Sequence, residues 1–401
     1  MSRNIIFCFD GTCNDPEDAV QKESLVGGAK DNSITNVLKL HLLLGGDLKN
    51  PCPDSENSQL SLYYSGVGTY GGKFKRAFNA ALAPDNLDVR DIINEGIKDF
   101  RQFYKENDNI FIFGFSRGAA IARRFASVLE SRHGSPAIRF LGVFETVASI
   151  GIPDLNRQNR PASDVVFEHG HTIAGNITEA LHLVCIDEKR KAFQPTLMNY
   201  ESRVTEIWFS GAHSDVGGGY YRDGLSDVTL RFMLDELDKR ELSLDIQAPS
   251  AIDYSAILPE NAGYEIDFTD LIIEPDVFGK NHQQRRPPLS AWITLDNREL
   301  RVNENDKKSD KLPVIHHSVA ERIYGVRKYR PKTIQGVKHR VVYPDDSCME
   351  FKGLQQHQEI GMHPCIALKP GKGKELVVFA HKKYNRTGLM LQKGVDENHF
   401  Q

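Results

Sequence analysis

Residues 110–125 read IFIFGFSRGAAIARRF, and this stretch decides how the rest of the chain is interpreted. Its apolar first half is typical of a buried strand, whereas its second half has the spacing of a helix with one apolar face. Gly114 and Gly118 of the intervening G-x-S-x-G pattern allow strand and helix to pass closely, because they lack a Cβ. A serine in a strained turn between them is typical of a nucleophile elbow. The stretch therefore predicts Ser116 as a nucleophile, with an ordinary strand-to-helix turn as the alternative.

The surrounding sequence alternates between strand and helix patterns. Short apolar runs predict strands at residues 4–9, 60–65, 138–144 and 205–210. Helical spacing of apolar side chains predicts helices through residues 34–42, 89–104, 180–184, 225–237 and 314–319. The strands lead into loops of polar or glycine residues. This alternation indicates an α/β-hydrolase-like fold, in which helices flank a mostly parallel sheet.

The chain divides into a main domain and a smaller C-terminal module. Residues 1–330 are predicted to form the α/β-hydrolase domain, with a cap or insertion at about 245–310, where prolines and charges are frequent. Short alternating runs predict a small β-rich module at 335–401. Residues 322–401 carry 15 Lys and Arg against 7 Asp and Glu, a net charge of +8, whereas residues 1–321 carry 35 against 47, a net charge of −12. The basic module indicates either peripheral contact with an anionic membrane or an ordinary solvated surface.

Composition excludes several other classes of protein. No apolar run of about 18 residues and no signal-peptide layout occur, so a cytoplasmic protein is expected. The six cysteines are scattered without a C-x-x-C pair, which disfavours a disulfide framework or a zinc site. The phosphate-binding pattern G-x-x-x-x-G-K-[ST] is missing, and the basic module has few aromatic residues among its lysines. We therefore expect no nucleotide cofactor and no nucleic-acid partner.

A nucleophilic serine needs an imidazole to accept its proton and a carboxylate to fix the tautomer of that imidazole. In α/β-hydrolases these partners follow in the order Ser, acid, His, each at the carboxyl end of a strand. Glu145 ends the next predicted strand, and His213 follows the strand after that, in the glycine-rich loop GAHSDVGGGY. The order predicts Glu145 as the acid and His213 as the general base.

Two alternatives remain open for these roles. Asp215 is the alternative acid, although an Asx-type bond that holds its own loop would explain it as well. His316, with its neighbour His317, is the alternative base. A structural role at the start of a helix is favoured for both histidines.

The oxyanion of an acyl-transfer reaction needs backbone donors near the nucleophile. The N–H of Arg117 and those of Gly11 and Thr12, after the first strand, are the predicted donors. Asp10 is interpreted as a residue that caps this loop. No second carboxylate cluster lies nearby in the sequence, so no metal site is predicted.

Seven segments in order carry a resemblance to a known family: FDGTCN at 9–14, TNV at 35–37, YSGVGT at 64–69, GFSRGA at 114–119, FLGVFETV at 140–147, DEKR at 187–190, and residues 209–220. Together they resemble the uncharacterised α/β-hydrolase domain family that includes type VI secretion phospholipase effectors. The family triad is Ser, Asp and His, and the matching positions are Ser116, Glu145 and His213. Glu145 departs from the aspartate usual at the acid position.

The resemblance implies hydrolysis of glycerophospholipid esters, and hence a lipid or ester substrate. It also implies a secretion machinery or an immunity protein as a partner, and export by a signal-independent secretion system. The resulting hypothesis is a serine hydrolase that cleaves phospholipid esters through an acyl-enzyme. A soluble carboxylesterase or thioesterase on a small substrate, and a non-catalytic binding protein with a hydrolase fold, are the alternatives.

Overall fold

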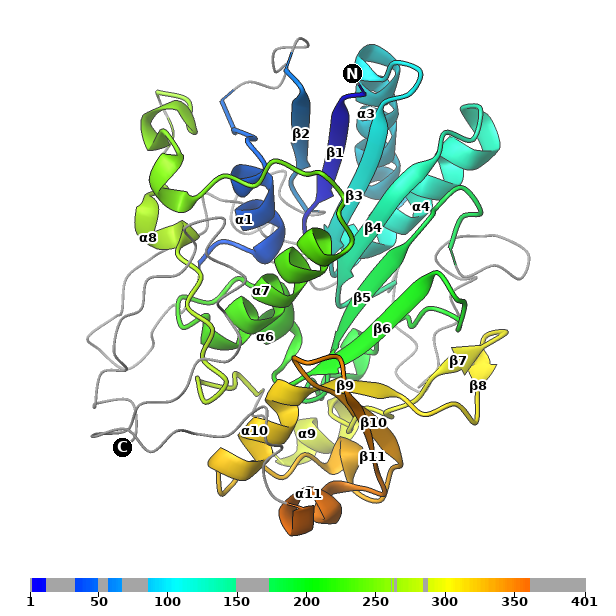
Figure 1. Cartoon of the computed structure of the whole chain (residues 1–401), viewed down its shortest axis with the longest axis vertical. Coiled ribbons are helices and arrows are strands. Elements are labelled where there is room, and N and C mark those ends of the chain that lie inside the picture. Colours follow the sequence, from blue (N-terminus) through cyan, green and yellow to red (C-terminus); the bar gives the residue numbers. More distant parts are fainter. Residues whose placement is uncertain are drawn as a thin grey trace.

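A single sheet of nine strands forms the centre of the molecule (Figure 1). The computed structural model describes residues 2–11, 33–49, 57–66, 86–148, 173–260, 262, 265–283 and 288–360. The strands of the sheet, in spatial order, are β11 (Cys348–Phe351), β10 (His339–Val342), β9 (Val314–His316), β6 (Val204–Phe209), β5 (Ala180–Cys185), β4 (Ile138–Phe144), β3 (Asn109–Phe115), β1 (Asn4–Phe9) and β2 (Gln59–Tyr64). All neighbouring strands are parallel except β10 and β11. This confirms the predicted mostly parallel sheet.

Helices cover both faces of this sheet. The described helices are α1 (Asn36–Leu43), α3 (Asn86–Phe103), α4 (Arg117–Arg132), α6 (His213–Gly217), α7 (Gly224–Lys239), α8 (Phe268–Leu271), α9 (Pro288–Thr294), α10 (His317–Gly325) and α11 (Leu354–Ile360). Figure 1 shows α3 and α4 on one face and α1 and α7 on the other. Alternate residues of β1 belong to the two cores, Phe7 to the α3 and α4 side and Ile6 to the α1 and α7 side. The inner strands β1 and β3 are almost continuously apolar because both of their faces are covered.

The helix predicted around His182 is wrong, because residues 180–185 form the central strand β5. All six residues of β5 are buried, and the strand pairs with β4 and β6. A short apolar run fits the periods of both strand and helix, and here the two neighbouring strands decide. Residues 314–316 are likewise strand β9, and the helix predicted there begins only at His317.

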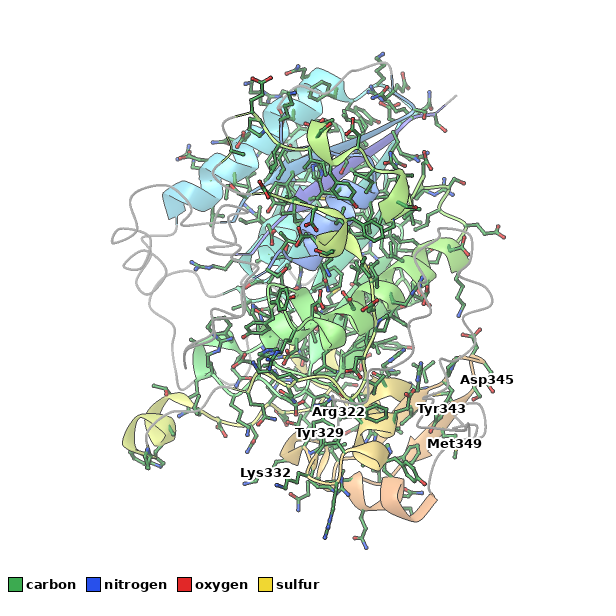
Figure 2. The ribbon with its side chains drawn as sticks, turned by 90° about the vertical axis from the view of Figure 1, so that its left-hand side faces the viewer. Arg322, Tyr329, Lys332, Tyr343, Asp345 and Met349 are labelled. Carbon is green, nitrogen blue, oxygen red and sulfur yellow. The ribbon has the colours of Figure 1, made fainter. Side chains whose placement is uncertain are left out.

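The sheet continues past residue 335, where a separate module is predicted. β10 pairs with β9, and Val341 and Phe351 join a buried cluster that also contains Trp208 of β6. Figure 2, in which Tyr343 and Met349 are labelled, shows this part of the chain at one end of the molecule. Residues 361–401 lie outside the described part of the chain, so the separate module remains a prediction.

The predicted insertion at about 245–310 is made of short elements. It contains α8, α9 and a two-stranded hairpin of β7 (Asn303–Glu304) and β8 (Lys307–Lys308). Figure 2 shows α9, in yellow at the lower left, projecting from the body of the molecule. Among the described helices, none combines the length and the apolar character that a bilayer-crossing helix needs.

Candidate active site

The order of the strands indicates where a ligand would bind. The chain passes from β1 to β2 on one side and from β3 to β4 on the other, so the direction of winding reverses between β1 and β3. Open parallel sheets form a crevice at the carboxyl ends of the strands at such a point. Asp10 follows β1 and Ser116 follows β3, so both lie beside this crevice.

Ser116 occupies the tight turn between β3 and α4, with a φ of 58° and a ψ of −123°. A positive φ is unfavourable for serine, so the surrounding packing must hold the turn. At Gly118 a Cβ would lie 2.2 Å from the carbonyl oxygen of Asp10, and at Gly114 it would lie 2.7 Å from the Cα of Ala119. The glycines therefore permit the close passage of strand and helix that the sequence predicts.

His213 begins α6, just after β6, and contacts the serine. Its Nε2 lies 2.8 Å from the Oγ of Ser116. The imidazole contacts two phenyl rings, with centroid distances of 4.8 Å to Phe115 and 4.9 Å to Phe193. Its backbone N–H donates to Oε2 of Glu188 at 3.3 Å. These contacts hold the ring against Ser116.

Glu145 follows β4 in a turn with a φ of 48°, and its side chain is fully buried. Its Oε2 accepts a hydrogen bond from Nδ1 of His213 at 3.1 Å, and its Oε1 accepts one from the backbone N–H of Cys185. Since Nδ1 donates in this bond, Nε2 presents its lone pair to the Ser116 hydroxyl. The structure thus brings the predicted nucleophile, base and acid into one chain of hydrogen bonds.

Arg298, from the predicted insertion, binds the same carboxylate. Its Nη1 and Nη2 donate to Oε1 and Oε2 of Glu145, each at 2.8 Å. The same two nitrogens donate to the carbonyl oxygens of Cys185, at 2.8 Å, and Phe193, at 2.6 Å. Arg298 is not predicted from the sequence, because 153 positions separate it from Glu145 and it belongs to no local motif.

The charges of this group follow from burial and pairing. Burial opposes the ionisation of Glu145, but the Arg298 guanidinium and the His213 hydrogen bond outweigh it and hold the pKa of Glu145 well below its usual range. Burial lowers the pKa of His213, against the opposing effect of Glu145. At neutral pH the acid is therefore ionised and the imidazole is neutral, which is the form that accepts a proton from serine.

Asp215, the alternative acid, binds other groups. Its Oδ2 accepts hydrogen bonds from the backbone N–H groups of Ala212, at 2.8 Å, and His282, at 2.9 Å. Its Oδ1 lies 2.5 Å from Nδ1 of His282. Asp215 therefore ties the start of α6 to the insertion, which agrees with the loop-holding role considered for it.

His316, the alternative base, caps α10. Its Nδ1 accepts a hydrogen bond from the backbone N–H of Ser318 at 3.3 Å, and its ring stacks on Phe209 with a centroid distance of 4.6 Å. Nδ1 of the adjacent His317 lies 2.5 Å from Glu321. Both histidines are engaged at the start of this helix.

The proposed oxyanion donors are only partly described. Arg117 is the first residue of α4, a position where the amide has no acceptor within the helix. The N–H of Gly11 donates to Oδ1 of its neighbour Asp10 at 2.6 Å. Thr12 lies outside the described residues.

Asp10 is buried at the end of β1 and holds its surroundings together. Besides the Gly11 bond, its Oδ2 accepts hydrogen bonds from the hydroxyls of Thr35 and Tyr63, both at 2.6 Å. These hydrogen bonds tie the end of β1 to the start of α1 and to β2. The loop that Asp10 is predicted to cap lies outside the described residues after Gly11. Within the described ranges, no three His, Cys, Asp or Glu side chains gather as a metal site would require.

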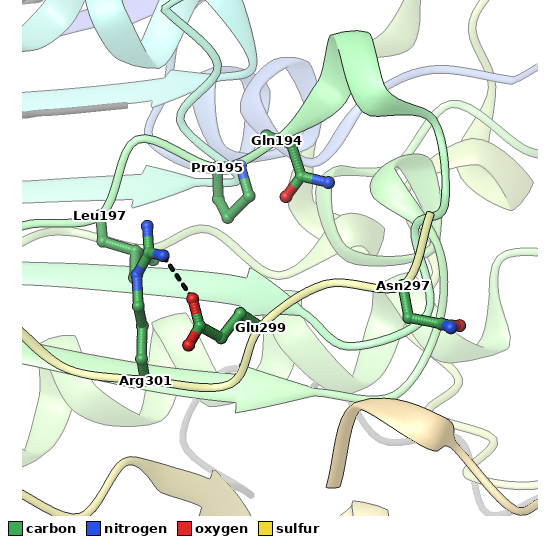
Figure 3. Close-up of a pocket in the computed structure, with 6 residues that line it drawn as sticks. All are labelled: Gln194, Pro195, Leu197, Asn297, Glu299 and Arg301. Atoms are coloured by element: carbon green, nitrogen blue, oxygen red, sulfur yellow. Dashed lines mark hydrogen bonds and ion pairs between the residues drawn. The ribbon is translucent and has the colours of Figure 1, made fainter. Parts of the chain in front are cut away.

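A surface pocket lies beside the segment that carries Arg298 (Figure 3). It is lined by Gln194, Pro195, Leu197, Asn297, Glu299 and Arg301. Arg301 donates to Glu299 at 2.8 Å there. Because residues 297, 299 and 301 line the pocket, the alternation of an extended chain turns residue 298 to the other side, toward Glu145. The pocket therefore flanks the site and does not contain the serine.

Comparisons with known proteins match most of this region. A sequence profile described as T6SS, phospholipase effector Tle1-like, catalytic domain matches residues 3–132 and 129–236, a span that includes Ser116, Glu145 and His213 and ends before Arg298. An uncharacterised protein of Saccharomyces cerevisiae is 23% identical, over 71% of this chain and 46% of its own length.

Among solved structures, an uncharacterised protein from Pseudomonas aeruginosa has 18% identity and a TM-score of 0.41, covering 69% of this chain and 49% of its own. The Tle1 effector bound to the VgrG spike from the type 6 secretion system has 22% identity and a TM-score of 0.31, covering 55% and 51%. The chain thus spans about half the length of these relatives. Since the profile matches more than half of the 401 residues, the chain belongs to the family of type VI secretion system phospholipase effectors, Tle1-like, catalytic domain.

Proposed function

We propose that this chain is a serine hydrolase that cleaves carboxylic esters of phospholipids. The observation that carries the proposal is the hydrogen-bond chain from Ser116 through His213 to Glu145, with distances of 2.8 and 3.1 Å. The family to which the chain belongs supports a lipolytic substrate. The neutral state of His213 and the ionised state of Glu145 suit the roles of base and acid.

The proposed reaction has two halves. Ser116 attacks the ester carbonyl while Nε2 of His213 takes the hydroxyl proton, and the resulting imidazolium is stabilised by Glu145. The tetrahedral intermediate collapses, His213 gives the proton to the leaving alcohol oxygen, and an acyl-enzyme remains. Water then attacks the acyl group with His213 again as base, which releases the fatty acid and restores Ser116.

The oxyanion of the intermediate needs donors at the strand edge. We propose the amide of Arg117 as the principal donor, because the amide of Gly11 donates to Asp10 in the structure. Gly11 becomes a second donor to the oxyanion if substrate binding turns its N–H away from Asp10. The amide of Thr12 completes the proposed set.

We also propose partners for the chain. The family name supports export through a type VI secretion machinery after synthesis in the cytoplasm. An immunity protein would block the activity inside the producing cell. The basic residues of the C-terminal part are proposed to contact an anionic membrane.

A fluorophosphonate probe tests the serine mechanism. We expect the probe to label the wild type and not Ser116→Ala, and only the wild type to release fatty acid from phospholipid vesicles. Equal labelling or equal hydrolysis in both proteins would contradict the proposal. A wild type that is never labelled would favour the non-catalytic binding protein.

The substrate class needs a second comparison. A phospholipase is expected to act faster on micellar or vesicular phospholipid than on the same short-chain lipid below its critical micelle concentration. A preference for monomeric esters would favour the soluble carboxylesterase or thioesterase.

A further inference from the structure

We propose that Arg298 is a positioning residue for this site, which fixes Glu145 in place and offsets its charge next to His213. The inference rests on the proposed function, because Arg298 acts through the acid and the base of the proposed mechanism. It goes beyond the family match, which ends at residue 236.

Geometry is the first argument. Glu145 receives four hydrogen bonds, two from Arg298, one from His213 and one from the backbone of Cys185. Its Oε2 is shared by Arg298 and His213, so a rotation of the carboxylate would break bonds to both. A glutamate has one more rotatable bond than an aspartate, and the two-pronged contact removes that freedom.

Arg298 is itself held firmly. Its guanidinium bridges the carbonyl oxygens of Cys185, which ends β5, and Phe193, whose ring lies against His213. Just before it in the chain, the backbone N–H of Asp296 donates to the carbonyl oxygen of Lys189 at 2.7 Å. The guanidinium therefore connects the acid, a strand end and the loop that encloses the base.

Electrostatics is the second argument. The charged groups that act on His213 directly are Glu145, Glu188 and Arg190, and Arg298 lies behind Glu145. Arg190 donates to Glu188 at 2.8 and 2.9 Å, and Arg298 is paired with Glu145, so each carboxylate has its own cation. An unpaired buried carboxylate would favour the imidazolium form of His213. With Arg298 present, His213 stays neutral, and able to act as a base, at lower pH.

A purely structural brace would have different consequences from a positioning residue. Loss of a brace weakens the fold and lowers the amount of active protein at every pH. Loss of a positioning charge moves the pH at which His213 becomes active. The pH profile of serine reactivity therefore distinguishes the two roles.

The experiment measures the rate of Ser116 labelling by a fluorophosphonate from pH 4.5 to 9. The proteins compared are the wild type, Arg298→Lys, Arg298→Gln and the matched control Arg301→Gln. Arg301 lies on the same segment and pairs with Glu299, away from Glu145. Circular dichroism establishes that each variant is folded.

We expect Arg298→Lys to be labelled about 10- to 100-fold more slowly with the acidic midpoint unchanged, because the charge remains and the two-pronged contact is lost. We expect Arg298→Gln to be slower as well, with its midpoint about one pH unit higher. The control should match the wild type. Wild-type rate and midpoint in both Arg298 variants, or the same change in the control, would overturn the proposal.

A second comparison applies if Arg298→Gln does not fold. Glu145→Gln is compared with the double variant Glu145→Gln/Arg298→Met, in which no buried ion is left unpaired. If Arg298 acts through Glu145, both are labelled at rates within about twofold, whereas a further tenfold fall in the double variant would overturn the proposal. A wild type that is not labelled at Ser116 would contradict the proposed function, which separates that failure from this one.

Discussion

The β3–α4 turn and the segment at residues 295–301 contact opposite ends of the hydrogen-bonded pair of His213 and Glu145. The turn contacts His213, and the segment binds Glu145. The turn presents one hydroxyl, held by a strained backbone at Ser116 and by close packing at Gly118. The segment presents a guanidinium, held by carbonyl oxygens from two other parts of the chain. The comparison separates the proposed reacting side chain, Ser116, from a side chain that fixes its neighbours in place and offsets their charge, Arg298.

The largest expected effect is at Glu145, the proposed acid, which joins Arg298 of the segment to His213. Glu145→Gln should lower kcat/KM by about 10⁴-fold, because the amide cannot stabilise the imidazolium of His213. Asp215→Asn should lower it by less than about tenfold, because Asp215 holds the loop and does not contact the ring of His213. Esterase assays on both purified variants check this, and a larger loss in Asp215→Asn would reverse the assignment of the acid.

The segment is expected to matter for stability as well. Arg298→Met leaves the Glu145 carboxylate buried without its cation, which should lower the free energy of unfolding by about 3 to 5 kcal/mol. Arg301→Met removes an ion pair with the partly exposed Glu299 and should cost about 1 kcal/mol or less. Urea denaturation of the two variants measures the difference. Equal losses of unfolding free energy in the two variants would mean that the Arg298–Glu145 pair stabilises the fold no more than the Arg301–Glu299 pair does.

The activity should extend to lower pH than an ordinary histidine allows. In the proposed mechanism His213 must be neutral to accept the Ser116 proton, and burial lowers the pKa of His213 from the usual 6.5. Activity is therefore full above the folded-state pKa and lost as the pH falls through it. At pH 5.5 more than about 10% of the maximal kcat/KM should remain, which is the fraction that an unshifted base would leave. A profile measured from pH 4.5 to 8 with an acidic midpoint at or above 6.5 would contradict this.

The smallest effect is expected at the outer end of the insertion. Trp292 in α9 is 80% exposed, so Trp292→Ala should change the free energy of unfolding by no more than about 0.5 kcal/mol. Its rate on a soluble short-chain ester should match the wild type. A clear loss of that rate would show that the insertion supports the site through α9 as well as through Arg298.

The sequence predicts the elements that local patterns define. The strand, turn and helix around Ser116 follow from one continuous stretch. The positions of Glu145 and His213 follow from the rule that the carboxyl ends of parallel strands lie at one edge of the sheet, although β5 separates their strands, β4 and β6. Residues 180–185 could not be assigned this way, since a six-residue apolar run fits a helix as well as a strand. Only the pairing of β5 with β4 and β6 resolves it.

The partners of the acid lie beyond local patterns. Arg298 reaches Glu145 because residues 296–302 of the insertion, which form neither helix nor strand, run across the ends of β4 and β5. The place of β10 and β11 in the main sheet depends in the same way on long-range pairing with β9. The periodicity of apolar residues in a local stretch does not predict such contacts, because they arise from the packing of segments that are distant in the sequence.

The positive φ of Ser116 also bears on how this protein would evolve or respond to engineering. A backbone held in such a region costs roughly 1 to 3 kcal/mol, and glycine at this position would relieve most of that strain. Selection for thermal stability alone would thus favour Ser116→Gly, a variant that keeps the fold and loses the proposed nucleophile. Stabilised libraries of this chain should therefore be screened for hydrolysis together with melting temperature, because at residue 116 the two properties are opposed.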